Sequence, residues 1–440
     1  MFGYYLDLAW RSLRRHKILA ALMTLAIALG IGASVTMLTV LHNLSGNPLP
    51  GRSDVLFHPQ VDPRPADLPG AKVEPPDNLT YLDAANLYRM GIAPRRAVMG
   101  GNWLPVRKDV PDSPLAMTTN RATTADFFAM FGVPFVYGSA WSAQDDANHA
   151  QLVVLSQALN QKLFGGADSV GKTLVIATKT FRVAGVIGAW NPQPRFYDVD
   201  DAYDGGAFAA AEQMYMPFFT WLDLPQDYGY GSMDCWGTDP NAGQHNPKAP
   251  QCTWAQFWVE LDTPAQVADY RAALEQYSRQ QHQLGRFQRA PNVRLRGLLD
   301  WLDYKHVIPV TVRMQTWIAF GVLLICMVNT VGLMVAKFLR KSGEIGVRRA
   351  LGASRRAVFL QCLVEAGVVG AAGGLLGLPM AWLGLWMVRQ QPVSFAASAH
   401  FDPSMLVAAL ALALLSALLA GVWPALRASR VAPALQVKSL

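Results

Sequence analysis

The stretch Gly166-Ala-Asp-Ser-Val-Gly171-Lys172-Thr173 matches the phosphate-binding pattern G-x-x-x-x-G-K-[ST] letter for letter. Such a motif must follow a buried strand and open a helix, because backbone N–H groups and the helix terminus hold the phosphate. Here the order is reversed, since a helix-like segment (157–164) precedes the motif and a β-rich run (174–177) follows it. We therefore interpret the motif as a turn between helix and strand, and we predict no nucleotide site there.

Four aspartates in one short segment could supply oxygen ligands for calcium. They are Asp198, Asp200, Asp201 and Asp204. The EF-hand pattern fails, because Ala202 stands where an oxygen ligand is needed and Tyr203 where glycine is needed. An irregular calcium site stays open as an alternative. No H-E-x-x-H pattern, His/Cys cluster or G-x-S-x-G elbow is present. The sequence therefore predicts no catalytic residue, no metal site and no cofactor.

The basic stretch Lys337–Arg356 indicates docking rather than catalysis. It holds seven Lys and Arg residues against one acid, Glu344, and uninterrupted apolar segments flank it on both sides. A short basic loop between two membrane spans stays in the cytosol, because Lys and Arg resist translocation. Inside it, residues 344–351 predict a two-turn helix with Gly343 before it and Gly352 as its stop. A helix held out in the cytosol suits a partner protein, and a solvated basic loop is the alternative.

The composition is that of a membrane protein. Of the 440 residues 52% are hydrophobic and 16% charged, against about 25% charged in soluble proteins. Segments 1–17, 337–356 and 424–440 carry 14 of the 38 basic residues but only two of the 31 acids, Asp7 and Glu344. The net charge of +7 therefore reflects membrane topology and gives no support for nucleic-acid binding.

Four apolar segments predict membrane spans. They are 18–41, 311–336, 357–388 and 403–423. An amphipathic helix over 1–17 leads into the first span; a cleaved signal peptide is the competing interpretation, but its apolar core would be about 7–15 residues long. Because the N-terminal helix, the 337–356 loop and the 424–440 tail are basic, both termini are predicted in the cytosol. The domain at 42–310 and the 389–402 loop are then outside.

Residues 42–310 predict a mixed α/β domain. Period-2 alternation predicts strands such as 181–187, and residues 264–283 predict a helix. Four leucines at helical spacing predict a helical stalk before the second span: Leu295, Leu298, Leu299 and Leu302. The aromatic, Pro-rich insert 190–258 could pack as core or line a hydrophobic path, and we favour packing. Its cysteines, Cys235 and Cys252, are predicted to form a disulfide on the oxidising side of the membrane.

The third span carries two unusual features. Glu365 lies about eight residues inside it, with Gln361 one turn earlier. An acid within a membrane segment is by default a functional hypothesis, so a role in the coupling region and simple interfacial placement both remain open. Two overlapping pairs of small residues predict close helix packing in the same span. These are Gly370 with Gly374 and Gly373 with Gly377.

Several motifs resemble permeases of the MacB/FtsX-like ABC-transporter family. Glu344-Ile-Gly-Val-Arg-Arg-Ala-Leu-Gly-Ala-Ser354, followed by Glu365-Ala, resembles the family's cytosolic loop and third-span entry. Trp10-Arg-Ser-Leu-Arg-Arg-His-Lys17 resembles its N-terminal entry, and Ala420-Gly-Val-Trp-Pro-Ala-Leu-Arg-Ala-Ser-Arg430 its C-terminal exit. Within the outer domain, Phe127-Phe-Ala-Met-Phe-Gly-Val-Pro134, Leu163-Phe-Gly-Gly166, Val170-Gly-Lys-Thr173 and Val183-Ala-Gly-Val186 match the periplasmic core. The resemblance thins over 48–120 and 190–258.

The resemblance implies a fold class: an α-helical membrane protein with four transmembrane helices and a large mixed α/β extracytoplasmic domain inserted between helices 1 and 2. It implies a multi-pass permease of the bacterial inner membrane that works as a dimer with a second copy or a paralogue. The short cytosolic helix would be its coupling helix, with Glu344, Ile345, Val347, Arg348 and Leu351 docked on an ABC ATPase. We expect that ATPase to be a separate cytosolic subunit, because the cytosolic segments total fewer than about 60 residues.

Within the family, efflux members dock a periplasmic adaptor and an outer-membrane channel, and the outer-domain motifs are nearest to that type. The expected function is therefore ATP-driven efflux from the periplasm through a tripartite assembly, by a chain without a catalytic site of its own. The expected partners are the ATPase, the second permease, the adaptor, the channel and membrane lipid, with no nucleic acid. A lipoprotein-sorting permease and a non-transporting sensor or scaffold are the alternatives.

Overall fold

The computed structural model describes residues 2–15, 17–68, 73–200, 206–225, 228–237, 242, 246–391, 395–396 and 403–430. The chain divides into two compact units. One joins Met1–Ser45 with Ile308–Leu440 and is helical, and the other is Gly46–Val307 and is mixed α/β. Each unit has its own hydrophobic core, so each is described by itself.

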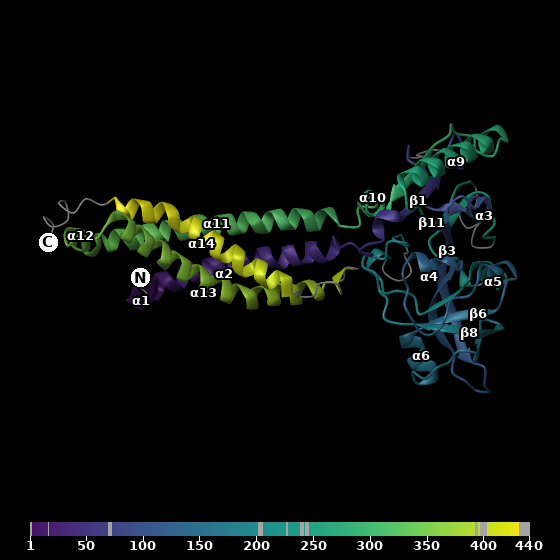
Figure 1. Cartoon of the computed structure of the whole chain (residues 1–440), viewed down its shortest axis with the longest axis horizontal. Coiled ribbons are helices and arrows are strands. Elements are labelled where there is room, and N and C mark those ends of the chain that lie inside the picture. The colour runs from purple at the N-terminus through teal and green to yellow at the C-terminus, as the bar shows by residue number, and fades with distance from the viewer. Residues whose placement is uncertain are drawn as a thin grey trace. The chain divides into compact units, whose positions relative to one another are not determined.

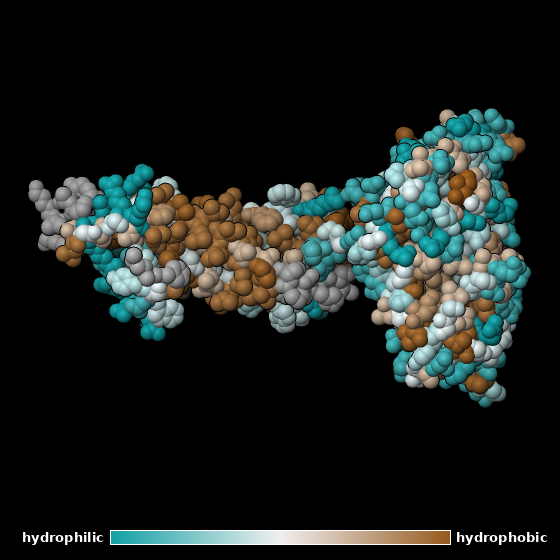
Figure 2. All heavy atoms as spheres, viewed as in Figure 1, coloured by the Kyte–Doolittle hydropathy of each residue, from teal (hydrophilic) through white to brown (hydrophobic). Residues whose placement is uncertain are grey.

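Four helices of the first unit are long and apolar enough to cross a membrane by length and composition. They are α2 (Lys17–Leu44), α11 (Val310–Arg340), α13 (Arg355–Arg389) and α14 (Pro403–Ser429). Hydrophobic residues cover much of their surface (Figure 2). The helices run a few residues beyond the apolar segments at 18–41, 311–336, 357–388 and 403–423. The reason is that Lys and Arg are good helix formers, so the backbone continues through the first charged turn.

Two shorter helices lie at one end of this bundle, α1 (Phe2–Arg15) and α12 (Ser342–Ala350) (Figure 1). The helix α1 is amphipathic, because Ala9 and Ser12 are buried while Tyr4 and Trp10 are more than half exposed. An exposed aromatic row on a basic helix is typical of a segment that lies in the membrane interface.

The helix α13 packs on two neighbours through its glycines. Gly373 and Gly377 lie against α2, whereas Gly370 and Gly374 lie against α14. A Cβ atom added to Gly374 would stand 2.7 Å from Cβ of Ala413 on α14. Since carbon atoms in contact lie about 3.5–4.0 Å apart, the two backbones approach more closely than any larger residue would allow.

The second unit is built on a sheet of 12 strands within the described residues. Its main path has the order β12 (Val293–Gly297), β1 (Leu56–Val61), β11 (Cys252–Glu260), β3 (Arg95–Lys108), β4 (Ala116–Thr123), β9 (Met214–Pro217), β6 (Leu152–Ser156), β8 (Lys179–Ile187) and β5 (Phe135–Gly138). The short strands β2 (Leu79–Thr80), β7 (Thr173–Ile176) and β10 (Asp234–Cys235) pair beside this path. Neighbours are antiparallel except β4 with β9 and β6 with β8.

Helices accompany this sheet. They are α3 (Tyr81–Met90), α4 (Asp126–Met130), α5 (Ala143–Ala147), α6 (Gln157–Phe164), α7 (Phe218–Leu222), α9 (Pro264–Gln283) and α10 (Leu298–Tyr304), with 3-10 turns at Ser53–Val55 and Gly206–Phe208. Side-chain caps set four of their starts, at α3, α5, α6 and α9. The Ser156 hydroxyl accepts from Leu159 N at α6, and the Thr263 hydroxyl accepts from Gln266 N at α9.

The stalk prediction is wrong for Leu295, which lies on strand β12, while Leu298, Leu299 and Leu302 lie on the short helix α10. Apolar and basic residues alternate from Val293 to Arg296 in the sequence, and a period of two favours a strand when a partner edge is free. The strand β1 supplies that edge. Leu295 fits both the helical spacing of the leucines that follow it and the alternation that begins at Val293, so only the pairing decides between helix and strand at this residue.

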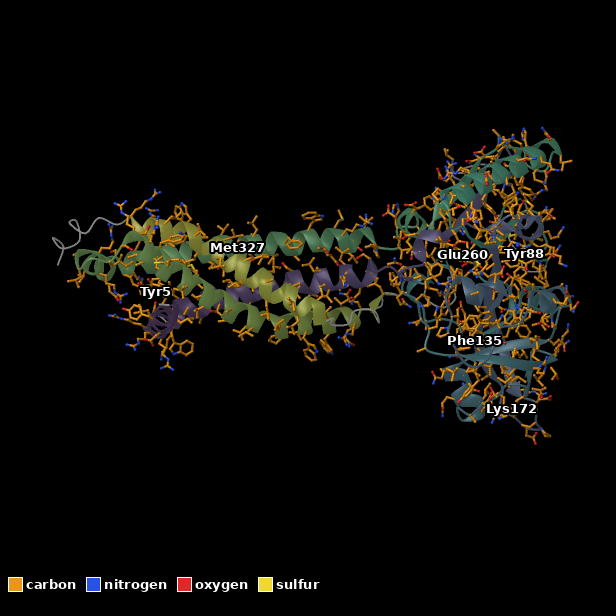
Figure 3. The ribbon with its side chains drawn as sticks, in the orientation of Figure 1. Tyr5, Tyr88, Phe135, Lys172, Glu260 and Met327 are labelled. Atoms are coloured by element: carbon orange, nitrogen blue, oxygen red, sulfur yellow. A yellow bond between two sulfur atoms is a disulfide. The ribbon has the colours of Figure 1, made fainter. Side chains whose placement is uncertain are left out.

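The P-loop-like motif is a turn. It follows helix α6 and leads into strand β7, the order opposite to that of a phosphate-binding loop. Lys172 is labelled in Figure 3. Its ammonium lies 5.0 Å from the centre of the Phe164 ring. Lys172 therefore covers an aromatic side chain of α6, as the turn interpretation expects.

The aromatic insert packs as core. Trp221, Trp254 and Trp258 are each at most 2% exposed, and the rings of Trp221 and Trp254 lie 5.7 Å apart. Cys235 and Cys252 are register partners on β10 and β11 and are joined by a disulfide. This disulfide closes a loop with a sequence separation of 17, for which loop closure alone contributes about 3 kcal/mol.

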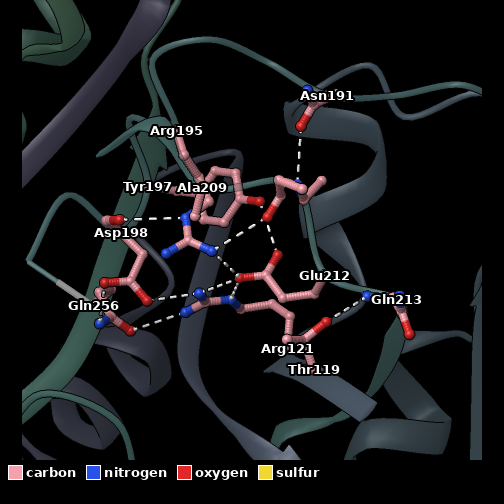
Figure 4. Close-up of polar contacts among 12 residues, drawn as sticks. Thr119, Arg121, Asn191, Arg195, Tyr197, Asp198, Ala209, Glu212, Gln213 and Gln256 are labelled. Carbon is pink, nitrogen blue, oxygen red and sulfur yellow. Dashed lines mark hydrogen bonds and ion pairs between the residues drawn. The ribbon is translucent and has the colours of Figure 1, made fainter. Parts of the chain in front are cut away.

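A buried ion network fastens the insert to the sheet (Figure 4). Arg121 on β4 pairs with Asp198 at 2.6 Å and also with Glu212. Arg195 lies 3.3 Å from the same Glu212 carboxylate, and the Tyr197 hydroxyl donates to its other oxygen at 2.8 Å. Burial opposes ionisation of Glu212, but the nearby guanidinium groups outweigh it and hold its pKa below the ordinary value.

The aspartates considered for calcium have other partners where the structure describes them. Asp198 pairs with Arg121, and Asp200 lies 2.6 Å from Lys305 Nζ. Asp201 and Asp204 lie outside the described residues. Within the described residues no group of three or more His, Cys, Asp or Glu side chains could hold a metal ion.

Candidate functional site

The short helix α12 lies between the candidate spans α11 and α13 and is the centre of the candidate site. It begins at Ser342, directly after the end of α11, so Gly343 lies inside it rather than before it. Gly352 has φ of +101°, a conformation open to glycine, and reverses the chain after α12. The Ser354 hydroxyl then accepts from Ala357 N and starts α13. Two tight turns thus hold one helix at the end of the bundle.

The predicted coupling residues divide between the two faces of this helix. Ile345 is 9% exposed and belongs to the bundle core with Phe338 and Val358. Val347 is 44% exposed, and Leu351, directly after the helix, is 84% exposed. Ile345 therefore anchors the helix, whereas Val347 and Leu351 present apolar surface away from the bundle.

Glu344 and Arg348 belong to a bridge rather than to the free face. Arg348 donates to Glu344 at 3.0 Å along the helix and to the Gln361 side chain on α13 at 3.1 Å. A pair of this exposure contributes only about 0.3–0.5 kcal/mol. Its value lies in orientation, because the planar guanidinium fixes α12 against the first turns of α13.

A buried charge cluster lies beneath α12. Glu365 of α13 is 4% exposed and pairs with Lys337 and Lys341, which lie at the end of α11 and directly after it. Ser12 of α1 donates its hydroxyl to the same carboxylate and receives a hydrogen bond from Lys341. A lone carboxylate would be costly at this depth, so the cluster ties α1, α11 and α13 together where α12 begins.

The sequence identified Glu365 but not its partners. Interfacial placement and a part in the coupling region were both open, and the structure puts this carboxylate in a buried cluster at the base of α12. Lys337 carried only the signal of a basic residue at the start of the 337–356 stretch. Ser12 carried none, since it is 353 residues away from Glu365 in sequence.

The end of the bundle that holds α12 is strongly basic. Thirteen Lys and Arg residues of the described chain lie near it on α1, the start of α2, the end of α11, the turns around α12 and the end of α14: Arg11, Arg14, Arg15, Lys17, Lys337, Arg340, Lys341, Arg348, Arg349, Arg355, Arg356, Arg427 and Arg430. The opposite helix ends carry Arg313 and Arg389. Hydrophilic residues also gather at the α12 end in Figure 2. This asymmetry is the charge pattern of a cytosolic face.

The remaining predicted residues are not part of this site. Gly370, Gly373, Gly374 and Gly377 lie along the middle of α13, where they allow helices to approach. Cys235 and Cys252 belong to the mixed α/β unit. Only the coupling residues and Glu365 come together around α12.

Comparison with protein-family models gives two matches. The MacB-like periplasmic core domain matches residues 20–277, and the FtsX-like permease C-terminal domain matches residues 317–433. Together they cover most of the outer unit and most of the four long helices.

Curated relatives match along almost the whole chain. The "Macrolide export ATP-binding/permease protein MacB" of Rhodospirillum rubrum is 25% identical over 98% of this chain and 60% of its own length. The "Pyoverdine export ATP-binding/permease protein PvdT" of Pseudomonas entomophila is 24% identical over 97% of this chain and 58% of its own length. The chain thus spans about 60% of the length of these relatives.

Among solved structures, the periplasmic region of MacB from Actinobacillus actinomycetemcomitans matches 60% of this chain and 96% of its own, with a TM-score of 0.36 and 14% identity. The chain combines apolar helices of membrane-spanning length with a MacB-type periplasmic core domain, which is the arrangement of a multi-pass inner-membrane protein. The family model that matches more than half of its residues shows that this chain belongs to the MacB/FtsX-like family of ABC-transporter permeases.

Proposed function

We propose that this chain is the permease subunit of an ABC exporter, and that a separate cytosolic ATPase drives it through α12. The observation that carries the proposal is the apolar face of Val347 and Leu351, held out from the bundle between the basic ends of α11 and α13. An exposed leucine surrounded by basic residues suits a groove on a partner protein that is apolar inside and acidic at its rim. The reason is that interfaces combine apolar anchors with complementary charge.

Movement of α12 would reach the rest of the bundle through rigid contacts. Ile345 is packed in the core, and the cluster of Glu365, Lys337, Lys341 and Ser12 binds α1, α11 and α13 to its base. The helix α11 then continues without interruption for 31 residues, which at 1.5 Å per residue is about 46 Å. A displacement at α12 would therefore be carried to the outer domain along one helix, so that the chain transmits force without passing substrate through itself.

The orientation proposed is α12 and both termini in the cytosol, with residues 46–307 in the periplasm. The thirteen basic residues at the α12 end support it, and so does the disulfide between Cys235 and Cys252, because disulfides persist in oxidising compartments. The export named for the MacB and PvdT relatives supports an efflux function. The family resemblance of the sequence motifs is the ground for proposing efflux from the periplasm by a dimer, with a periplasmic adaptor and an outer-membrane channel.

Recovery of the ATPase with the membrane-embedded chain tests this proposal. The tagged full chain is purified from its native membranes, and co-purifying ATP hydrolysis is measured with vanadate as inhibitor. Leu351→Asp and Val347→Asp are each expected to lower the recovered activity by about thirtyfold, since loss of an interface anchor costs about 2 kcal/mol. Burying a charge in the apolar contact is the physical cause.

Leu351→Met is the matched control, because it keeps an apolar side chain of similar volume at the same position. It is expected to retain the wild-type ATPase recovery. Full recovery with both Asp variants would rule out α12 as the docking helix. If the wild-type chain brings down no ABC ATPase, a sensor or scaffold role replaces the exporter; if an ATPase is recovered without an adaptor, lipoprotein sorting becomes the better function.

A further inference from the structure

A pocket of about 690 Å³ opens in the outer unit, beside the first turns of α6. Three segments form it: the start of α6, the chain that leaves β8, and the chain that enters β9. Its volume is in the range of small-molecule sites, about 300–1,000 Å³. The permease function proposed above makes no use of it.

Apart from the Ser156 hydroxyl, which caps α6, and the Glu212 carboxylate, the polar side chains around this pocket are amides. They are Gln157, Gln161, Asn191 and Gln213, each largely exposed. Asn191 accepts from Ala211 N at 2.9 Å, which holds its side chain at the rim and leaves its NH₂ group toward other partners (Figure 4). An amide offers both donors and acceptors on one group, so four of them suit a ligand with many hydroxyl groups.

An indole ring forms part of the wall. Trp190 is partly exposed and lines the pocket, and the ring of Tyr197 stacks nearly parallel to it with centroids 5.7 Å apart. The Phe127 ring meets it edge-on at 5.7 Å. Because these rings hold Trp190 rigidly, its uncovered part gives a fixed apolar surface beside the amides.

The described residues that line the pocket offer no free charge. Glu212 is the ionisable residue among those that line it, and its carboxylate is already bound by Arg121, Arg195 and Tyr197. Phosphate and carboxylate ligands need an unpaired cation, usually Arg or Lys, and an ammonium ligand needs a free carboxylate. The lining residues therefore favour an uncharged ligand.

We propose that this pocket binds a neutral oligosaccharide, whose hydroxyl groups meet the amides and whose apolar ring face lies on Trp190. This goes beyond the proposed coupling function and does not depend on it. A saccharide is the ligand class that presents hydroxyl groups and an apolar C–H face on one ring, which is the pairing that the wall provides.

Saturation-transfer NMR on the full chain in phospholipid nanodiscs tests the proposal, with tri-N-acetylchitotriose and maltotriose as probes. Maltoside detergents are excluded because their head group would compete. The wild-type chain is expected to transfer saturation to at least one trisaccharide. Gln157→Ala with Gln213→Ala is expected to weaken binding about tenfold, which is 1.4 kcal/mol, and Trp190→Phe is expected to do so while it keeps a ring for Tyr197 and Phe127.

Gln276→Ala is the matched control, an exposed glutamine on α9 far along the chain from the pocket segments, and it is expected to bind as the wild type does. Near-ultraviolet circular dichroism checks that each variant keeps its packed aromatic core. The proposal is overturned if neither trisaccharide binds the wild-type chain. It is also overturned if the pocket variants bind with unchanged affinity, or if the neutral peptide acetyl-triglycine-amide binds as tightly as the sugars.

Discussion

Arg121 and Glu212 show how single residues hold the outer unit together. The side chain of Arg121 is fully buried, and that of Glu212 is 2% exposed. Arg121 pairs with Asp198 and Glu212, and Glu212 also accepts a hydrogen bond from the Tyr197 hydroxyl. A buried charge is tolerated only when it is paired and hydrogen-bonded, because its desolvation costs several kcal/mol. The network therefore fastens residues 195–198 and Glu212 to β4.

Glu212→Gln tests this network. The variant leaves Arg121 and Arg195 facing a neutral amide, so the free energy of unfolding of the outer unit is expected to fall by about 3–5 kcal/mol at pH 7. The measurement is urea unfolding of the full chain, followed by tryptophan fluorescence. Glu275→Gln on α9 is the matched control, because that carboxylate is 46% exposed and pairs with Arg279 at 3.5 Å; its cost is expected to stay below about 1 kcal/mol.

The difference in stability between the wild type and Glu212→Gln is expected to change with pH in a defined direction. The pKa of Glu212 is lowered in the folded chain, because Arg121 and Arg195 outweigh the opposing effect of burial. Its carboxylate therefore stabilises the fold above the unfolded pKa of about 4.3, and this contribution is lost as pH falls through the lower folded pKa. The stability gap between the wild type and Glu212→Gln should narrow below about pH 4.3. A gap that widens on acidification, or equal costs for Glu212→Gln and Glu275→Gln, would contradict the network.

At the scale of elements, α13 contacts α2 and α14 through opposite glycine pairs. Gly374→Ala is expected to lower the free energy of unfolding of the helical unit by about 1–3 kcal/mol, because overpacking forces neighbours apart. The new methyl group would stand 2.7 Å from Ala413 Cβ. Thermal unfolding of the chain in nanodiscs measures the loss.

Gly367→Ala on the same helix is the control for this prediction. Its added Cβ would find Leu418 Cδ2 at 3.8 Å, which is ordinary contact, so its melting temperature should match that of the wild type or exceed it. Equal melting temperatures for Gly367→Ala and Gly374→Ala would mean that the glycines of α13 do not set the helix spacing.

The elements also show what a single sequence can predict. Hydropathy over more than 20 residues located the long helices, and a proline after Thr263 with Gln266 at the third helical position marked the start of α9. The helix prediction was wrong for Leu295 because this residue fits both the helical and the strand period. A strand also needs a partner edge, and β1 provides it from more than 200 residues away. The partners of Glu365 were not predicted for a similar reason, since Ser12 lies 353 residues away in sequence. Local patterns were readable, and pairings between distant segments were not.

At the scale of the whole molecule, the charge asymmetry of the bundle supports the proposed orientation in the membrane. Thirteen basic residues lie near the α12 end and two at the opposite helix ends within the described residues. Short loops rich in Lys and Arg stay on the cytosolic side, and this bias sets the orientation of a membrane protein. Acidic residues contribute little to the orientation. Every partner in the proposed function depends on this orientation, because an ATPase can reach α12 only from the cytosol.

Single-cysteine labelling tests the orientation directly. Leu351→Cys and Leu284→Cys place thiols at sites that are 84% and 70% exposed in the helical and outer units. The native thiols of Cys326 and Cys362 are buried, and Cys235 and Cys252 are joined, so the wild-type chain supplies the background. A membrane-impermeant maleimide should label Leu284→Cys on intact spheroplasts and Leu351→Cys only in inside-out vesicles, because the basic loop around α12 resists translocation. Labelling of Leu351→Cys on intact spheroplasts would place α12 outside the cytosol, and docking of an ATPase on Val347 and Leu351 would then be impossible.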